Sequence, residues 1–130
     1  MTKSSKKQPA KKRPARNKPL TWDAVRLLAL ALPGVEDGTS YGTPALKVAG
    51  KLLVRLREDR ETIAIRVELA VREVLMGTRP ETYYVTDHYR CYPWMLVRLS
   101  SADLGDLRDL IHEAWRRNAP KRLVAGSSPP

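Results

Sequence analysis

The segment "TDHYRCYPW", residues 86–94, gathers side chains that could support several kinds of chemistry. Residues 87–91 are, in order, Asp, His, Tyr, Arg and Cys, and Trp94 follows closely. Three kinds of site are compatible with these residue types: a metal centre, a thiol active site and a ligand-binding surface loop. The spacing of the residues and the rest of the sequence rank these options.

A metal centre at this segment lacks ligands. Asp87, His88 and Cys91 supply at most three, whereas a structural zinc site takes four, usually Cys and His in paired spacings. The second histidine of the chain, His112, falls on the charged side of a predicted helix and is expected to face solvent. We therefore predict no bound metal and no cofactor.

A thiol active site also lacks its supporting geometry. A nucleophilic cysteine needs a nearby base and a third group that orients this base. His88 and Asp87 have the right types, but adjacent side chains of an extended segment point in opposite directions. The sequence contains no G-x-S-x-G, P-loop, G-x-G-x-x-G or H-E-x-x-H motif. We predict no catalytic residue and no enzymatic activity.

A surface loop that leads into a strand is the favoured interpretation of the segment. His88, Tyr89 and Trp94 are the candidate ligand contacts, because aromatic side chains stack on planar ligands. For Tyr92 and Trp94 the favoured interpretation is that they pack against the core, because aromatic residues make up only 6% of the chain and Phe is absent. For His88 and the neighbouring Arg90, both interpretations stay open.

Charge divides the chain into an arm and a domain. The 130 residues carry a net charge of +10, and residues 1–19 hold eight of the 24 Lys and Arg with no acid. This arm has three prolines and no apolar periodicity, so we expect it to be disordered. One modest domain is expected over residues 20–125, followed by a frayed C-terminus over 126–130. The remaining residues carry a net charge of only +2.

Composition also bears on location. No stretch approaches the roughly 20 apolar residues of a membrane span, and the N-terminus lacks the apolar segment of a signal peptide. The single cysteine, Cys91, cannot form an intrachain disulfide. We therefore expect a cytoplasmic protein with no membrane partner.

Hydrophobic periodicity predicts an α+β fold. Thr21 is a predicted N-cap with Asp23 in the first helical turn, and Ser100 with Asp103 resembles a capping box before the last helix. Helices are expected over 21–32, 68–77 and 104–118, and strands over 43–48, 51–57, 62–67 and 94–99. The short connections favour antiparallel pairing. The predicted order is α-β-β-β-α-β-α, an antiparallel sheet with its helices packed on one face.

Alternation along the strands divides the predicted sheet into an apolar and a basic face. The helix-covered face receives Leu46, Val48, Leu52, Val54, Leu56, Ile63, Ile65, Val67, Met95, Val97 and Leu99. The opposite face receives Lys47, Lys51, Arg55, Arg57, Arg66, Trp94 and Arg98, among Ala45, Leu53, Thr62 and Ala64, with no acid at a strand position. Such a face could contact a phosphate backbone. The alternative is a solvated face whose charges prevent aggregation.

Three stretches carry a resemblance to a known family: "LPGVEDGTSYGTPALKVAGKLLVRLRED", "TYYVTDHYRCYPWMLVRL" and "LRDLIHEAWRRNAPKRLVA". Over residues 20–125 the chain resembles the bacterial MmcQ/YjbR family. The resemblance implies a frataxin-like (CyaY-like) fold and a double-wing DNA-binding arrangement, with hairpins around Ala49–Gly50 and Glu58–Glu61 as the wings. The resemblance assigns no catalytic residues to this chain. It gives no reason to expect iron binding either, because the first helix has a single acid, Asp23.

Together these observations favour a non-enzymatic DNA-binding protein of low sequence specificity. The alternative is a protein-interaction or small-anion-binding module whose arm is a non-specific tether. The predicted DNA contacts are Lys47, Lys51, Arg55, Arg57, Arg66, Arg90 and Arg98 in the fold, and Lys6, Lys7, Lys11, Lys12, Arg13 and Arg16 in the arm.

Overall fold

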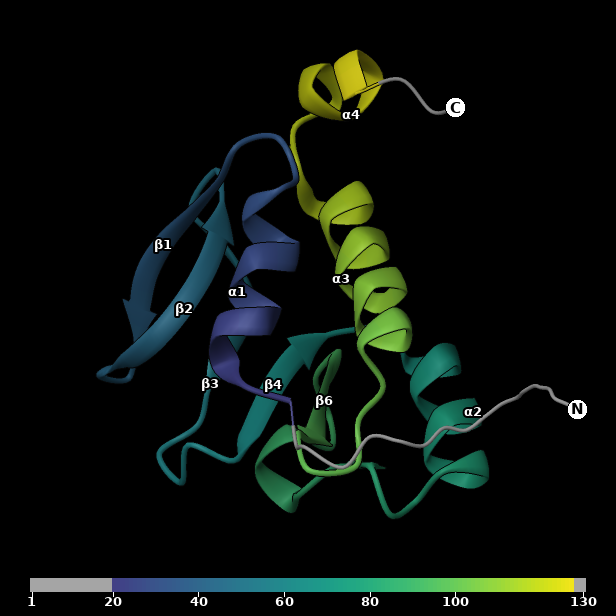
Figure 1. Ribbon diagram of the computed structural model, residues 1–130. Helices are drawn as coiled ribbons and strands as arrows, with labels where there is room; N and C mark the ends of the chain where they lie inside the picture. The colour runs from purple at the N-terminus through teal and green to yellow at the C-terminus, as the bar shows by residue number, and fades with distance from the viewer. Residues whose placement is uncertain (1–19, 128–130) are drawn as a thin grey trace, which may run out of the picture.

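The computed structural model of the chain describes residues 20–127, which form an antiparallel sheet and its covering helices (Figure 1). In chain order the elements are α1 (Trp22–Leu30), β1 (Val35–Ser40), β2 (Thr43–Val48), β3 (Lys51–Leu56), β4 (Thr62–Arg66), α2 (Leu69–Thr78), β5 (Tyr83–Tyr84), the 3-10 helix η3 (Asp87–Tyr89), β6 (Trp94–Arg98), α3 (Leu104–Asn118) and α4 (Lys121–Ser127). The strand order is β1-β2-β3-β4-β6-β5. The predicted α+β class with an antiparallel sheet is confirmed.

The main core lies between one face of the sheet and the helices α1 and α3, which run side by side in front of it in Figure 1. Val25 and Ala29 of α1 and Leu107, Ile111 and Trp115 of α3 are buried there. They meet the inward side chains of the strands, and apolar residues of α2 pack on the same core from its edge. The opposite face of the sheet, here called the outer face, carries no helix of the main core.

Polar side chains define where two of these helices begin. The Thr21 hydroxyl accepts a hydrogen bond from the Ala24 backbone N–H at 3.2 Å, as predicted for an N-cap. At α3 the cap is Asp103, whose carboxylate accepts from the Asp106 N–H at 3.0 Å. The predicted capping box beginning at Ser100 was therefore wrong, because the chain makes a further turn before the helix starts.

A β-bulge changes the alternation in β3. Leu46 pairs with Val54, whereas Lys47 pairs with Leu52, so β3 contains one additional residue between these pairs. Residues paired across antiparallel strands share a face. Leu52 therefore lies on the outer face, and Leu53 is fully buried in the main core. The prediction had these two leucines reversed, because a bulge leaves no signal in a short apolar run.

The bulge also moves Lys51 away from the outer face. Lys51 pairs with Val48, a core residue, so it does not share a face with Lys47 as predicted. Beyond the bulge the predicted alternation holds: Trp94 pairs with Arg66 and Arg98 with Thr62 on the outer face. Met95 and Val97 point into the core.

The strand β1 was not predicted. Its sequence "VEDGTS" has low β propensity, yet it pairs along its whole length with β2. Glu36 lies opposite Lys47, so the expectation that no acid occupies an outer strand position was wrong. Asp37 points the other way and forms a bidentate pair with Arg26 of α1, at 2.8 and 2.7 Å. This hydrogen-bonded pair holds the pKa of Asp37 below its usual range.

The C-terminal helix α4 packs beside the turn that follows α1. Gly34 in this turn has φ +77°, which favours glycine, and a β-carbon there would lie 2.5 Å from Cδ1 of Leu123 in α4, so any other residue would displace that side chain. The Trp115 indole donates to the Pro33 carbonyl at 2.8 Å and ties α3 to the same turn. Helix α4 was not predicted, and it includes residues 126 and 127 of the expected frayed end.

The predicted arm, with its six residues expected to contact DNA, lies outside the described residues.

The ionisation of the Tyr83 phenol reports on the burial of this side chain in the core. Its side chain is 1% exposed, and its hydroxyl has no hydrogen-bond partner among residues 20–127. Burial raises the pKa of Tyr83 to about 12. The phenol ionises near pH 10 in an unfolded chain, so the folded state holds this proton more tightly.

We predict that Tyr83 makes the protein lose stability as the pH rises from about 10 to about 12. Below pH 10 both states keep the proton and its contribution is complete. The loss should reach roughly 2 to 3 kcal/mol. Urea unfolding of the native chain and of Tyr83→Phe across this pH range measures it, because the variant lacks the titrating group. Equal pH dependence in the two proteins would contradict the prediction.

Candidate functional site

Four arginines on the outer face each lie against an aromatic ring. The distances from the guanidinium carbon to the ring centre are 5.1 Å for Arg55 and Tyr41, 5.8 Å for Arg57 and Tyr89, 4.8 Å for Arg66 and Trp94, and 4.0 Å for Arg98 and Tyr84. All four fall within the range of cation–π attraction. We call these four arginines and their aromatic partners the arginine face.

Arg55 differs most from its predicted role. It is only 4% exposed, and its Nη1 donates to the Thr43 hydroxyl at 2.9 Å and to the Leu56 carbonyl at 3.2 Å. Its Nη2 lies 3.6 Å from the exposed carboxylate of Glu58. The Nε has no hydrogen-bond partner among the described residues. Arg55 is therefore a buried structural donor with one unused N–H, and it is not the solvated side chain that alternation predicted.

Arg57 and Arg66 are half-buried. Arg66 donates from Nε to the Leu52 carbonyl at 2.8 Å, and burial lowers the pKa of its guanidinium. Arginine nevertheless stays charged at neutral pH. The Nε of Arg57 is buried and has no partner in the described part of the chain. Both charges are thus partly removed from water, where attraction to an anion is stronger than at a fully solvated side chain.

Arg98 and Lys47 share the outer face but lie toward opposite edges of the sheet, on β6 and β2. Arg98 is exposed and donates to the Glu81 carbonyl at 3.1 Å while it lies over Tyr84. Lys47 is half-buried and faces Glu36 across β1. The structure thus brings together four of the seven fold residues predicted to bind DNA, keeps Lys47 on the same face and places Lys51 off it.

The segment 86–94 is a compact turn on the outer face. The 3-10 helix η3 (Asp87–Tyr89) begins it, and Tyr89 is buried against Ala64 and Leu96 in a small second core. Tyr92 is 58% exposed. The interpretation that Tyr92 packs against the core was therefore wrong, and Tyr89 takes that place. Trp94 is half-buried and packs against the second core.

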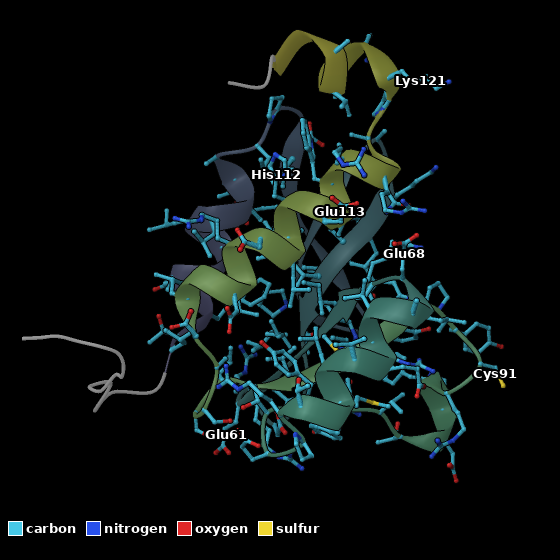
Figure 2. The ribbon with its side chains drawn as sticks, turned by 90° about the vertical axis from the view of Figure 1, so that its right-hand side faces the viewer. Glu61, Glu68, Cys91, His112, Glu113 and Lys121 are labelled. Carbon is cyan, nitrogen blue, oxygen red and sulfur yellow. The ribbon has the colours of Figure 1, made fainter. Side chains whose placement is uncertain are left out.

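The remaining polar residues of this segment point outward. His88 and Arg90 are exposed. The ring centres of His88 and Tyr89 lie 4.8 Å apart in a T-shaped arrangement, and Arg90 forms an ion pair with Asp87 at 3.2 Å. Cys91 is exposed, and Figure 2 shows it projecting from the side of the molecule away from α1. No hydrogen bond joins His88 to Cys91 within residues 20–127.

A buried arginine of α2 holds the segment in place. Arg72 is 5% exposed, and its guanidinium donates to four backbone carbonyls. The acceptors are Tyr89 at 3.3 Å, Tyr92 at 3.0 Å, Trp94 at 3.0 Å and Arg90 at 2.8 Å. This role was not predicted, because an arginine inside a predicted helix gives no sign of burial.

The segment and the strands enclose a cavity on the arginine face. Its volume is about 300 Å³, and it is lined by Tyr41, Leu52, Arg55, Ala64, His88, Tyr89, Tyr92 and Trp94. Tyr41 comes from the β1–β2 turn, and sequence analysis assigned no chemistry to this turn. It is 77% exposed and has φ +53°, a conformation that costs a non-glycine residue energy. The signal that could have found it is an aromatic residue directly before the glycine of a tight hairpin turn.

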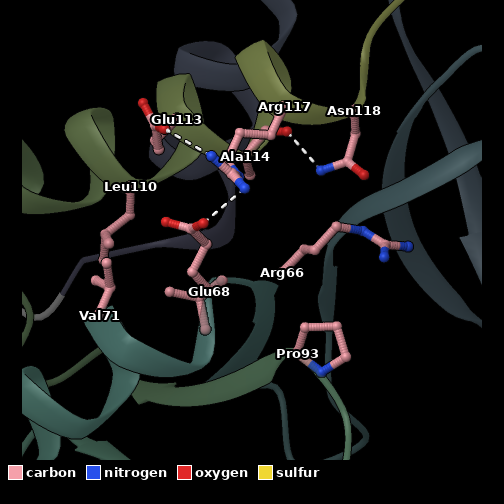
Figure 3. Close-up of a pocket in the computed structure, with 10 residues that line it drawn as sticks. Arg66, Glu68, Val71, Pro93, Leu110, Glu113, Ala114, Arg117 and Asn118 are labelled. Carbon is pink, nitrogen blue, oxygen red and sulfur yellow. Dashed lines mark hydrogen bonds and ion pairs between the residues drawn. The ribbon is translucent and has the colours of Figure 1, made fainter.

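A second cavity, of about 290 Å³, lies between α2, α3 and the end of β4 (Figure 3). Arg117 bridges two carboxylates there, at 2.6 Å from Glu68 and 4.0 Å from Glu113. Arg116 holds the pKa of Glu113 below its usual range through a hydrogen bond. The two carboxylates of this cavity are thus paired with arginines, and Arg66 lines it as well, so the positive and negative charges of its lining balance.

Two kinds of feature are absent from the part of the chain that the structure describes. No group of three or more His, Cys, Asp and Glu side chains is placed to hold a metal ion. No helix there is long and apolar enough to cross a membrane.

The fold and the sequence comparisons agree on a class of protein. The crystal structure of Deinococcus radiodurans protein DR2400 matches this fold with a TM-score of 0.66 at 17% identity, covering 85% of this chain and 89% of that one. The uncharacterized proteins Rv2570 of Mycobacterium tuberculosis and Mb2600 of Mycobacterium bovis are 33% identical over 122 residues, covering 80% of this chain and 92% of theirs. The YjbR family model matches residues 30–117. The chain is thus an α+β protein with bacterial relatives, and it belongs to the YjbR family.

We predict that Arg72→Met destabilises the protein by roughly 2 to 4 kcal/mol, because carbonyls buried around the guanidinium lose their donor. Hydrogen exchange of the amides in 87–94 should also accelerate. Arg90→Met is the matched control: it removes the same charge from an exposed pair that contributes at most about 1 kcal/mol. Equal stability of the two variants in urea unfolding would contradict the role of Arg72.

Proposed function

We propose that this protein is a non-enzymatic DNA-binding protein of low sequence specificity that acts in the bacterial cytoplasm. The observation that carries the proposal is the arginine face, where four guanidinium groups lie on aromatic rings on the side of the sheet away from α1 and α3. Stacked arginines keep their charge, and the three that are not buried, Arg57, Arg66 and Arg98, present N–H groups suited to phosphate oxygens.

Low specificity follows from the type of contact. Arg55, Arg66 and Arg98 lie on strands and Arg57 directly follows β3. Helices α1 and α3 pack on the other side of the sheet, so neither is available to enter a major groove from this face. Contacts to phosphates position a protein on DNA without identifying bases. The arm adds eight positive charges, which attract any polyanion regardless of sequence.

The alternative is a protein-interaction module, and one observation favours it. An apolar groove of about 470 Å³ lies between α1 and α3, where Leu27 is 65% and Leu104 41% exposed. Apolar surface of this kind is typical of protein contacts. In that case the arm alone would account for any DNA binding, and the fold would contribute nothing.

We predict that removing charge from the arginine face weakens duplex DNA binding by the full chain. The triple variant Arg57→Gln, Arg66→Gln, Arg98→Gln should lower the slope of log K against log salt by about 2 to 3, because each lost phosphate contact removes about 0.9. Fluorescence anisotropy with a labelled duplex across a salt series measures the slope. If the triple variant is unstable, Arg98→Gln alone can replace it in this measurement, because Arg98 is exposed.

The matched control is Arg108→Gln, Lys121→Gln, Arg122→Gln, which removes three charges from exposed positions on α3 and α4. A second variant changes all six predicted arm contacts to Gln in the full chain. The proposal requires that the arm variant still binds the duplex. It also requires that the slope of log K against log salt falls more in the face variant than in the control. Binding that vanishes with the arm charges, together with equal slopes for face and control, would favour the alternative.

A further inference from the structure

We propose that the cavity on the arginine face binds one unpaired nucleobase, so that the protein prefers single-stranded over duplex DNA. This inference rests on the proposed function and identifies the form of nucleic acid that the site takes. It follows from the size of the cavity, the chemistry of its lining and the placement of the surrounding charges.

The size of the cavity limits the ligand. Small-molecule sites span about 300–1,000 Å³, and this cavity, at about 300 Å³, lies at the lower end. It suits one planar ring system. A base pair or a dinucleotide is too large to enter it.

The lining selects a planar, partly apolar ligand. Leu52 and Ala64 are apolar, and the aromatic rings of Tyr41, Tyr92 and Trp94 surround them. Tyr41 and Tyr92 are largely exposed, so their rings are available to stack. Stacking on aromatic side chains is how proteins bind unpaired bases without selecting a sequence.

The buried arginine adds a positive charge at the same place. Arg55 lines the cavity, is 4% exposed, and has an Nε with no partner among residues 20–127. A guanidinium donates and cannot accept. The ring nitrogens and carbonyl oxygens of nucleobases are acceptors. The positive charge of Arg55 beside the cavity attracts these acceptors, although the Nε itself is covered by neighbouring atoms.

Positive charges lie where the phosphates of such a strand would pass. Arg66 lies over Trp94, which lines the cavity, and Arg57 lies over Tyr89, which lines it as well. Bases inside a duplex are stacked and paired, and extracting one costs free energy. A single strand offers its bases without this cost, so it should bind more tightly than a duplex of the same length.

The exposure of Tyr41 beside the cavity supports a binding role for its ring. The residue adopts φ +53° at a turn position that glycine or asparagine would occupy more easily, yet it is 77% exposed. Its ring lies over Arg55 at the cavity. Ala49 and Arg60 adopt a similar φ in other turns, so what distinguishes Tyr41 is its exposed ring, which is available to stack on a ligand at the cavity.

The test compares four labelled or competing probes on the full chain: an oligo-dT strand, its duplex with oligo-dA, an abasic strand of equal length and dTMP. The abasic strand keeps the phosphates and lacks the bases. We expect the dT strand to bind more tightly than the duplex and the abasic strand, and dTMP to bind far more weakly. Tyr41→Asn, which tolerates the positive φ, and Tyr92→Ala should each weaken dT binding by roughly 5- to 100-fold. Neither variant should change the affinity for the abasic strand.

Val74→Ala is the matched control, because it truncates an exposed apolar side chain on α2. Equal affinity for the dT and abasic strands, with no effect of either tyrosine variant, would overturn the inference while leaving DNA binding through phosphates intact. If dTMP binds with the same affinity as the dT strand, the ligand of the cavity is a free nucleotide and the inference of a single strand is wrong. If no nucleic acid binds once the arm charges are removed, the proposed function itself fails.

Discussion

The buried guanidinium of Arg72 is the interaction on which the outer face depends. A charge removed from water is costly unless it is hydrogen-bonded. The two terminal nitrogens of Arg72 donate to four carbonyls of one short segment, while its Nε has no partner among the described residues. Because the acceptors belong to residues 89–94, their conformation is fixed relative to α2. The side chains of Tyr89, Tyr92 and Trp94 are thereby placed on the face opposite the main core. The segment "TDHYRCYPW" is thus a wall of the cavity, and its shape is set by an arginine distant in sequence.

The same arrangement leaves the face positively charged. Arg72 forms no ion pair within residues 20–127, since its acceptors are neutral carbonyls. Arg55 also relies mainly on neutral acceptors, with Glu58 more distant at 3.6 Å. Aromatic rings rather than carboxylates cover the remaining arginines of the face. This contrasts with the cavity between α2 and α3, where Arg117 is neutralised by Glu68 and Glu113 (Figure 3).

Much of this architecture could be predicted from local patterns. Alternation in β4 and β6 placed Arg66, Trp94 and Arg98 on one face, and Thr21 marked the start of α1 correctly. The bulge in β3 could not be predicted, because a run of apolar residues fits either register. The strand β1 was missed because its stability comes from pairing with β2 and from the Arg26–Asp37 contact, and the partners in both lie outside the strand. Arg72 and Tyr41 were missed for a related reason: their importance depends on tertiary contacts that no spacing rule encodes.

The central claim is that nucleic acid binds the face organised by Arg72, and the three tryptophans test it directly. Trp94 lines the cavity, whereas Trp22 belongs to α1 and the Trp115 indole donates to the Pro33 carbonyl on the helix-covered side of the sheet. We would follow the three indole N–H signals of the full-length chain by NMR while single-stranded DNA is added. The account predicts that the Trp94 signal shifts with occupancy and that the other two stay in place. Movement of the Trp22 or Trp115 signal with an unchanged Trp94 signal would contradict it.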